Sequence, residues 1–474
     1  MIMIDNIKLA NYKSFFADQV KEAIDEQQKI NRSQMRNLFK TGELSLAYVD
    51  SIQHETGMII LKCPRRMAPR LKVLKGVCII KKGAKQALGE HVTEWICRWD
   101  EFVDNKDFHS PGSDMTPMYY VHTGDSNYDY VACSGFSFKL YDILSKALVD
   151  GKSLSLIVHN PFPPVEYFRN LASYMDAFSS NDELNLEPTI DYEEWTPEEL
   201  AFDEQKPTGI SDTIIDTLAN EHCCIVQGPP GTGKSYTIAS VISSYLDAGK
   251  TVCVTTMANK GLIELIKQKP LQKYVKEGRV SKTNLSIDER KQVSGVKAAS
   301  ADLQVPDGEM LCATNYQLSS VFSEKKMTLY GLPQYDLVVI EEASQAFLTA
   351  IVAFKQLGID CLIVGDPMQL PPIVKLNNPQ YNSWNVATQV EGLKSMVLGT
   401  SIKSYRIVTT FRLTSRSASL TKCFYGNRFV SVKQDYLDFT KANSVLFPQD
   451  GGVLYHCTLD VRNGVYSDKA DAII

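Results

Sequence analysis

The nine residues QGPPGTGKS, from Gln227 to Ser235, determine the interpretation of the whole chain. They follow the short apolar run 223–226 and precede a helical pattern that extends from Lys234 to Asp247. Every specified position of the phosphate-loop pattern G-x-x-x-x-G-K-S/T is filled. Glycines at these positions let backbone N–H groups curl around a polyphosphate, and the following helix directs its positive end at the same anion. The stretch therefore predicts a site for a nucleoside triphosphate.

The residues of this loop have distinct expected roles. Lys234 should reach the β- and γ-phosphates, and the Ser235 hydroxyl should occupy one coordination position on Mg²⁺. The expected ligand is a nucleoside triphosphate. Its remaining contacts are predicted at the rest of the loop and in the first helical turn, at Gly228, Pro229, Pro230, Gly231, Thr232, Gly233 and Tyr236.

Short apolar runs alternate with helical patterns around and after this loop. They lie at residues 223–226, 252–255, 311–313, 337–340 and 361–364. Runs of this kind are apolar on both sides, which is typical of strands in a parallel sheet covered by helices on both faces. The sequence therefore predicts an α/β fold with P-loop NTPase architecture.

Two further motifs supply the chemistry that a triphosphate site needs. Glu341 and Glu342 directly follow the run 337–340, at the strand end where parallel sheets hold their ligands. One acid is needed to hold Mg²⁺ and the next to orient or deprotonate the attacking water. Gln369, in GDPMQLPP (365–372), has an amide that can hydrogen-bond a γ-phosphate oxygen and a water together. These residues predict ATP hydrolysis.

The motifs resemble those of superfamily 1B helicases, in the branch of the nonsense-mediated-decay helicase and senataxin. The matching segments follow the family's order over residues ~200–474, and they are QGPPGTGKS (227–235), TTMANKGL (255–262), CATNYQLSS (312–320), VVIEEASQA (338–346), GDPMQLPP (365–372) and TTFRLTSRSASLTKCFYGNRF (409–429). The resemblance implies RecA-like lobes and an ATP-dependent helicase or translocase moving on single-stranded DNA or RNA. The alternative is a nucleotide-gated nucleic-acid-binding or scaffold module with slow or no hydrolysis.

The resemblance also implies a role for individual residues. Glu341 would hold the metal, Glu342 would act as general base and Gln369 would sense the γ-phosphate. Arg412 matches the arginine that the second lobe inserts against the γ-phosphate, and Phe411 replaces the usual tyrosine beside the base.

Three further positions come from the same resemblance. Gln205 resembles the glutamine that reads adenine, although its spacing to the loop is longer than the family's. Thr256 and Thr314 fall in segments that contact the nucleic-acid backbone, where small hydroxyls bind phosphates without reading sequence.

Two departures from the family pattern stand out. The metal-holding acid is usually Asp, and Glu341 is one methylene longer, which is expected to reduce turnover because Mg²⁺ tolerates little misplacement. The family's last two motifs, with a second catalytic arginine, are not found before Ile474. We therefore expect that the C-terminal half of the motor is missing from this sequence.

The expected organisation has four parts. They are an N-terminal accessory region over 1–180, with a small β-barrel or sheet at 43–85 and an α/β extension at 86–180, an acidic linker at 181–204, a RecA-like domain at 205–395 and the start of a second, incomplete one at 396–474.

The N-terminal part carries an uneven charge distribution. No acid occurs between Thr56 and Gly89, and nine basic residues do: Lys62, Arg65, Arg66, Arg70, Lys72, Lys75, Lys81, Lys82 and Lys85. They could grip a phosphate backbone or form a solvated face, and the sequence does not decide between the two. The aromatic residues of 86–180 favour a core over a base-stacking surface.

The acidic stretch from Asp182 to Glu204 contains no basic residue and is predicted to stay solvated. Thr196, Pro197 and Glu199 resemble a capping box with proline at N1, which predicts a helix start.

Composition sets the remaining limits. The net charge of −5 gives no overall nucleic-acid signal, and the eleven scattered cysteines form no metal-binding or disulfide pattern. No run approaches the ~18 apolar residues of a membrane span, and no signal peptide begins the chain. We expect a soluble protein of the cytoplasm that does not bind membranes.

Overall fold

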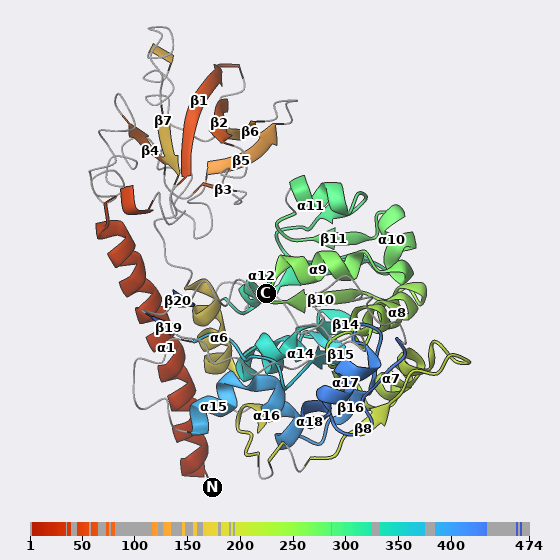
Figure 1. Cartoon of the computed structure of the whole chain (residues 1–474). Helices are drawn as coiled ribbons and strands as arrows, with labels where there is room; N and C mark the ends of the chain where they lie inside the picture. The colour runs from red at the N-terminus through yellow and green to blue at the C-terminus, as the bar shows by residue number, and fades with distance from the viewer. Residues whose placement is uncertain are drawn as a thin grey trace.

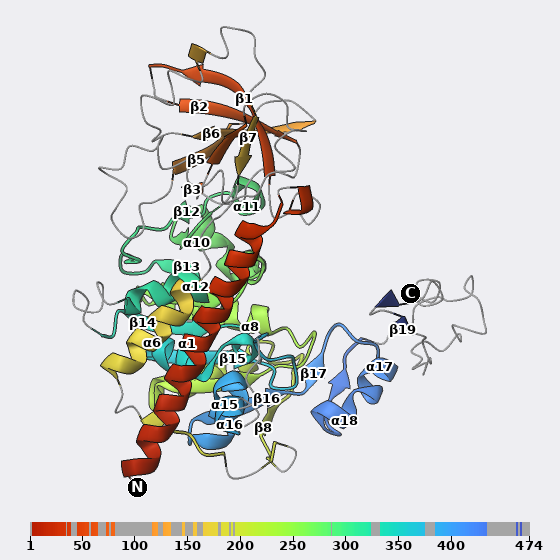
Figure 2. The same cartoon turned by 90° about the vertical axis from the view of Figure 1, so that its left-hand side faces the viewer.

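The computed structural model shows two sheets and a long N-terminal helix that runs beside the larger one (Figures 1 and 2). It describes residues 2–34, 36–38, 45–55, 58–64, 73–74, 77–80, 116–121, 127–133, 145–146, 155–158, 165–178, 182–188, 191–192, 195–285, 287–323, 332–374, 384–433, 461–462 and 465–466. Within these ranges, no helix is both long enough and apolar enough to cross a membrane.

The larger sheet has nine strands, and all its neighbouring pairs are parallel. In spatial order they are β12 (Lys297–Ala298), β11 (Val280–Lys282), β13 (Met310–Thr314), β10 (Val252–Thr256), β14 (Tyr335–Ile340), β15 (Gly358–Gly365), β9 (Cys223–Gln227), β16 (Lys403–Ile407) and β8 (Glu198–Leu200). Every residue of β9, β10 and β13 is buried. The predicted α/β fold with a parallel sheet is confirmed.

Successive residues of each strand enter two separate cores, because side chains alternate across a sheet. Cys224 and Val226 of β9 pack under helices on one face, while Cys223 and Ile225 pack under helices on the other. The first face is covered by α7 (Gly209–Glu221), α8 (Lys234–Asp247), α9 (Asn259–Ile266) and α10 (Gln272–Lys276). The second is covered by α1 (Ile2–Arg32), α6 (Glu166–Ala177), α14 (Leu348–Lys355), α15 (Trp384–Val390) and α16 (Gly392–Gly399).

Two helices from the expected accessory region therefore belong to the core of the ATPase fold. Phe15 and Phe16 of α1 are fully buried, and their ring centroids lie 5.8 and 5.5 Å from that of Phe347. Tyr167 and Leu171 of α6 join the same core. The boundary at residue 180 does not separate two packing units, because these apolar faces have the sheet's second face as their partner.

The smaller sheet has seven strands and is antiparallel throughout. Its order is β3 (Val73–Leu74), β5 (Thr116–Val121), β6 (Tyr128–Cys133), β2 (Met58–Pro64), β1 (Ser45–Gln53), β7 (Ser155–Val158) and β4 (Val77–Ile80). Strands thus occur in the predicted range 43–85, and β5, β6 and β7 extend the sheet into the range expected to be α/β. Of the nine basic side chains, Lys62 is described, with its Nζ 4.3 Å from the centroid of the Tyr128 ring. The other eight lie outside the described residues.

Apolar residues of the acidic stretch pack against the larger sheet, whereas the acids Asp182, Glu187, Asp191, Asp203 and Glu204 are exposed, as expected. Leu184, Leu186 and Tyr192 are buried, and the buried Lys8 donates a hydrogen bond to the Leu186 carbonyl oxygen. Strand β8 forms where the sequence predicted a helix start. The capping pattern is overridden because residues 198–200 pair with 405–407 of β16, and their acids meet basic partners.

Those partners come from the segment assigned to a second lobe. Lys403 forms an ion pair with Glu198, and Arg428 forms one with Glu199 at 3.3 Å. Strand β16 itself belongs to the first sheet, so the expected domain boundary at 396 is too early.

The remaining elements are short. They are η1 (Asp182–Leu184), η2 (Lys269–Leu271), α11 (Ile287–Gln292), α12 (Asn315–Leu318), η3 (Ser319–Phe322), η4 (Ala343–Gln345), α17 (Ser415–Leu420), α18 (Lys422–Tyr425) and the strand pairs β17 (Thr409–Thr410) with β18 (Val430–Ser431) and β19 (Val461–Arg462) with β20 (Val465–Tyr466).

Candidate nucleotide-binding site

The phosphate loop connects β9 to α8 at the carboxyl edge of the larger sheet. Gly231 and Gly233 have φ angles of 77° and 79°, a region that residues with side chains rarely adopt. The loop is closed by a hydrogen bond from the Gly228 N–H to the Gly365 carbonyl oxygen (3.0 Å) and by one from Thr232 Oγ1 to the Pro229 carbonyl oxygen (2.9 Å). The glycines are needed for this curvature, as the sequence predicted.

Lys234 begins α8 and lies folded back over the loop. Its Nζ donates hydrogen bonds to the carbonyl oxygens of Gly228 and Pro229, the second at 3.3 Å. Burial lowers the pKa of Lys234, and the nearby carboxylates of Asp366 and Glu341 oppose that change. A buried ammonium held by two carbonyl oxygens would gain from a phosphate oxygen, since charged acceptors form the stronger hydrogen bonds.

Ser235 and Glu341 meet although they are far apart in sequence. Ser235 Oγ donates to Glu341 Oε1 at 3.2 Å, and Glu341 is only 6% exposed. Burial raises the pKa of Glu341 to about 7, with a further contribution from the neighbouring Glu342. The extra methylene relative to Asp is thus accommodated while the contact with the loop serine is kept.

The surroundings of Glu341 fit Mg²⁺. Its Oε2 is buried and has no hydrogen-bond partner in the described part of the chain, and the same holds for Thr256 Oγ1. Both atoms border the space where Gly261 lacks a side chain, 3.5 and 3.2 Å from an added Cβ. Mg²⁺ usually keeps several waters and takes one or two carboxylates plus phosphate oxygens. Among the described residues, no group of three or more His, Cys, Asp or Glu side chains is placed so that it could hold a metal ion by itself.

Glu342 follows in an unusual backbone conformation. Its φ is 51°, in the left-handed region, and it precedes η4. Such strain in a residue with a side chain is concentrated at functional sites. Here it ends β14 abruptly and places two successive carboxylates beside the phosphate loop.

The loop that follows β15 is organised by a buried aspartate. Asp366 Oδ1 accepts from the Met368 N–H (3.0 Å), and its Oδ2 accepts from Gln369 Nε2 (3.2 Å) and from the Tyr425 hydroxyl (3.0 Å). Gln369 is exposed. Tyr425 lies on α18, so Asp366 connects the predicted sensor to the segment after β17.

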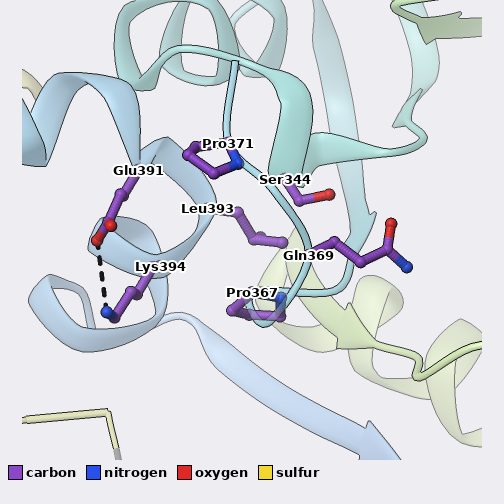
Figure 3. A pocket seen from close by; sticks show the side chains of 7 residues that line it. All are labelled: Ser344, Pro367, Gln369, Pro371, Glu391, Leu393 and Lys394. Carbon is purple, nitrogen blue, oxygen red and sulfur yellow. Dashed lines mark ion pairs between the residues drawn. The ribbon is translucent and has the colours of Figure 1, made fainter. Parts of the chain in front are cut away.

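A small pocket lies beside this loop (Figure 3). It is lined by Ser344, Pro367, Gln369, Pro371, Glu391, Leu393 and Lys394 and has a volume of about 30 Å³. The Gln369 amide points away from Glu391 and Lys394, which form an ion pair at 3.4 Å. The pocket holds about one water molecule and is not the nucleotide site.

The arginine segment lies directly on the phosphate loop. The Phe411 N–H donates to the Gly231 carbonyl oxygen (2.8 Å), and Thr410 Oγ1 donates to that of Pro230 (3.1 Å). Thr410 Oγ1 also accepts from the Arg412 N–H at 3.3 Å. A Cβ added to Gly231 would lie 2.3 Å from the Arg412 Cβ, so this approach requires glycine.

Arg412 follows β16, and the short strand β17 just before it pairs with β18 outside the larger sheet. The contacts with the phosphate loop place Arg412 where an inserted arginine is expected, and its delivery by a second lobe stays a prediction.

Phe411 forms an aromatic wall with Phe202. Their ring centroids lie 5.0 Å apart at an interplanar angle of 78°, and the Phe202 N–H donates to Thr409 Oγ1 at 3.0 Å. The Phe411 ring also approaches Gly233, at 3.6 Å from an added Cβ. Gln205 is exposed, with its N–H bonded to Asp203 Oδ1 at 2.9 Å. The described contacts join Phe411 to the loop, and none of them joins Gln205 to it.

A buried polar network behind the loop was missed by the sequence analysis. The Tyr192 hydroxyl donates to Gln227 Oε1 (2.5 Å) and accepts from Arg406 Nη2 (3.0 Å). Gln227 Nε2 donates to Ser404 Oγ at 3.0 Å. Burial raises the pKa of Tyr192, which keeps the phenol neutral. The signal available in the sequence was a tyrosine, with Trp195 close by, inside an otherwise acidic stretch.

Comparison with known proteins gives a family match over the nucleotide-binding part. Residues 211–375 match the model of the AAA domain family called AAA_19. The DNA replication ATP-dependent helicase/nuclease dna2 of Schizosaccharomyces pombe is 30% identical over 241 residues, which is 48% of this chain and 16% of that protein. DNA2 of Saccharomyces cerevisiae is 26% identical over 207 residues, covering 41% of this chain and 12% of that protein. JHS1 of Arabidopsis thaliana, with the same description, is 19% identical over 258 residues, covering 54% and 17%.

The chain thus spans less than a fifth of the length of these relatives. Among solved structures, the PRRSV helicase is 11% identical with a TM-score of 0.27, covering 48% of this chain and 38% of that one. The UvsW helicase from bacteriophage T4 is 10% identical with the same TM-score, covering 52% and 80%. Likeness at this level carries no argument. The order of the motifs, the matched AAA domain and the helicase relatives support a superfamily 1 helicase that is related to the Dna2-like helicases of the 1B branch.

Proposed function

We propose that this protein is an ATP-dependent helicase or translocase that hydrolyses ATP to move on single-stranded nucleic acid. One observation supports this proposal above the others. A single phosphate loop is surrounded by residues from segments far apart in the chain, namely Lys234, the Ser235–Glu341 pair, Glu342 and Arg412. A loop that bound nucleotide only for structural purposes would not need the paired acids or the arginine.

The chain's own residues divide the work of hydrolysis. The loop and Lys234 bind the phosphates, and Glu342 accepts a proton from the attacking water. The Arg412 guanidinium neutralises charge on the γ-phosphate, and the Gln369 amide hydrogen-bonds it once released from Asp366. Ser235 and Glu341 would hold Mg²⁺, which would supply positive charge to offset that of the phosphates.

The strand would pass over the ends of β10 and β13. Thr256 and Thr314 are paired in register at the carboxyl ends of these strands. Both side chains are buried, so main-chain groups at this edge would contact the phosphate backbone. The relatives are named as DNA replication proteins, which favours single-stranded DNA, and the site of action would be inside the cell.

One observation favours the alternative of a nucleotide-gated binding module. Glu341 stands where the family usually has Asp, and a longer acid at the metal position would slow turnover because Mg²⁺ tolerates little misplacement. The same residue keeps its hydrogen bond to Ser235, so we place the motor first.

The deciding experiment is phosphate release by the full-length protein with and without single-stranded DNA. A motor should release phosphate several times faster when the strand is added. Equal rates, with ATP binding demonstrated separately, would rule out the motor and leave the binding module. Omission of Mg²⁺ serves as the control for contaminating phosphatase.

A further inference from the structure

An exposed tyrosine lies at the edge where the strand is proposed to pass. Tyr316 is in α12, two residues after Thr314 at the end of β13. It is 43% exposed, whereas most large apolar side chains near the sheet are buried. Because α12 starts directly after β13, the ring is on the same edge as the Thr256 and Thr314 strand ends.

The Tyr316 ring is supported by a second tyrosine from the N-terminal region. Its centroid lies 4.7 Å from that of Tyr167, at an interplanar angle of 34°. Tyr167 is in the first turn of α6 and is only 1% exposed. Helices α6 and α12 lie side by side in both views (Figures 1 and 2). One side of the Tyr316 ring is therefore backed by a buried aromatic group while much of its surface remains open.

The supporting ring is firmly placed. The Tyr167 centroid is 5.8 Å from that of Phe168 and 6.2 Å from that of Phe347, within the second core. Asn170 Nδ2 on α6 also donates to Ser319 Oγ, just after α12, at 3.1 Å. A ring fixed in this way loses little conformational freedom when another flat group stacks on it.

We propose that the Tyr316–Tyr167 pair is a stacking platform for a base of single-stranded nucleic acid. This inference rests on the proposed function and adds a position at which the strand is held by its bases. Aromatic side chains stack on any base and give sequence-tolerant affinity, which suits a protein that travels along a strand. Burial raises the pKa of Tyr316, so its phenol stays neutral beside the phosphates.

The platform gives the N-terminal region a part in strand binding. The supporting Tyr167 precedes the phosphate loop by about sixty residues and lies on a helix that packs on the ATPase sheet. We therefore expect the segment carrying α6 to be required for full affinity.

The test compares two oligonucleotides that carry the same phosphates. Binding of the full-length protein to a fluorescent oligo-dT and to an abasic strand of equal length is measured by anisotropy over a range of salt. Loss of one stacked base costs about 1–3 kcal/mol, or roughly 5- to 150-fold in affinity. Tyr316→Ala should weaken oligo-dT binding by this factor, leave abasic binding unchanged and keep the salt slope, because no phosphate contact is lost.

Three variants sharpen the comparison. Tyr316→Phe should bind like the wild type, because the stacking ring is retained. Tyr316→Leu keeps an apolar contact with Tyr167 but has no aromatic face. It should lose the same affinity for oligo-dT as Tyr316→Ala, and it replaces that variant in the test if the alanine variant folds poorly. Phe424→Ala removes a ring that is 57% exposed on α18 and should not alter the difference between the two strands.

Equal losses on both strands, or no loss on oligo-dT, would overturn the platform. Either result would leave the proposed motor intact, provided that the wild type still releases phosphate faster with DNA. A wild type that binds neither strand would instead contradict the proposed function itself.

Discussion

The two halves of the candidate site are held in place by different means. The phosphate loop and the paired acids continue from β9 and β14, whose neighbours in the sheet fix them by backbone hydrogen bonds. The sensor loop and the arginine segment also have backbone bonds, such as that from the Phe411 N–H to the Gly231 carbonyl oxygen. In each of them, however, one side chain positions the functional residue, Asp366 for Gln369 and Thr410 for Arg412. We call these the sheet-held half and the side-chain-held half.

The difference has a consequence for mutation. In the sheet-held half, a substituted side chain removes its own chemistry while its backbone stays in place. In the side-chain-held half, a substitution of the holding residue displaces another residue that remains chemically intact. The first kind of change should have large effects and the second kind small ones.

Replacement of the loop lysine should have the largest effect. Lys234→Ala removes a buried charged partner of the phosphates, which typically costs about 2–5 kcal/mol, or roughly 30- to several-thousand-fold in affinity. ATP binding by titration calorimetry and strand-stimulated phosphate release should both be lost. Lys276→Ala, at an exposed position on α10, is the control. ATP affinity within a factor of three of the wild type would contradict the assignment.

Replacement of the second acid should separate binding from chemistry. Glu342→Gln keeps the size of the side chain but cannot accept the proton, so kcat should fall by about 10²–10⁴. ATP affinity should stay near that of the wild type because the loop is unchanged. Glu264→Gln, on the exposed side of α9, should hydrolyse normally. Normal hydrolysis by Glu342→Gln would mean that another residue is the general base.

Replacement of the metal-side acid should make the protein without nucleotide more stable at high pH. Burial raises the pKa of Glu341 from 4.5 to about 7, so between these pH values the folded protein holds a proton that the unfolded chain releases. The contribution of Glu341 to stability therefore decreases as pH rises from about 4.5 to 7 and stays unfavourable above that. At about 1.36 kcal/mol per pKa unit, the full effect is at most about 3.4 kcal/mol.

Glu341→Gln removes this titration. Urea unfolding at pH 5 and pH 8 should show the variant gaining stability over the wild type at pH 8 and little at pH 5. The exposed Glu204→Gln should show no such difference. If the difference in stability between the wild type and Glu341→Gln is the same at both pH values, the Glu341 carboxyl group ionises normally.

Replacement of the threonine that holds the arginine segment should have the smallest effect. Thr410→Val keeps the shape but loses hydrogen bonds to Pro230 and from Arg412, which is worth about 1 kcal/mol, or roughly fivefold. We expect kcat to decrease by this factor with ATP affinity unchanged, and Thr410→Ser to restore it. A loss of ATP affinity without a change in kcat would mean that Thr410 stabilises the phosphate loop and does not position Arg412.

The sheet-held half was the part that sequence could predict. The phosphate loop, the strand before it and the acids after β14 are local patterns. Their backbone geometry is predictable because glycine spacing or an apolar run within a few residues indicates it. The side-chain-held half was only partly predictable. Arg412 and Gln369 came from a family resemblance, whereas Thr410, Tyr425 and the Tyr192–Arg406 network were missed because each works through a partner distant in sequence.

The amino-acid sequence by itself determined the α/β class, the nucleotide loop and the identity of the reacting groups, because these follow from spacing within a few residues. Tertiary structure alone decided where the units end. It placed α1 and α6 on the ATPase sheet, turned part of an acidic stretch into its edge strand and brought the Arg412 segment onto the phosphate loop. These outcomes depend on which apolar face, unpaired strand edge or opposite charge lies nearby after folding, and no local pattern contains that information.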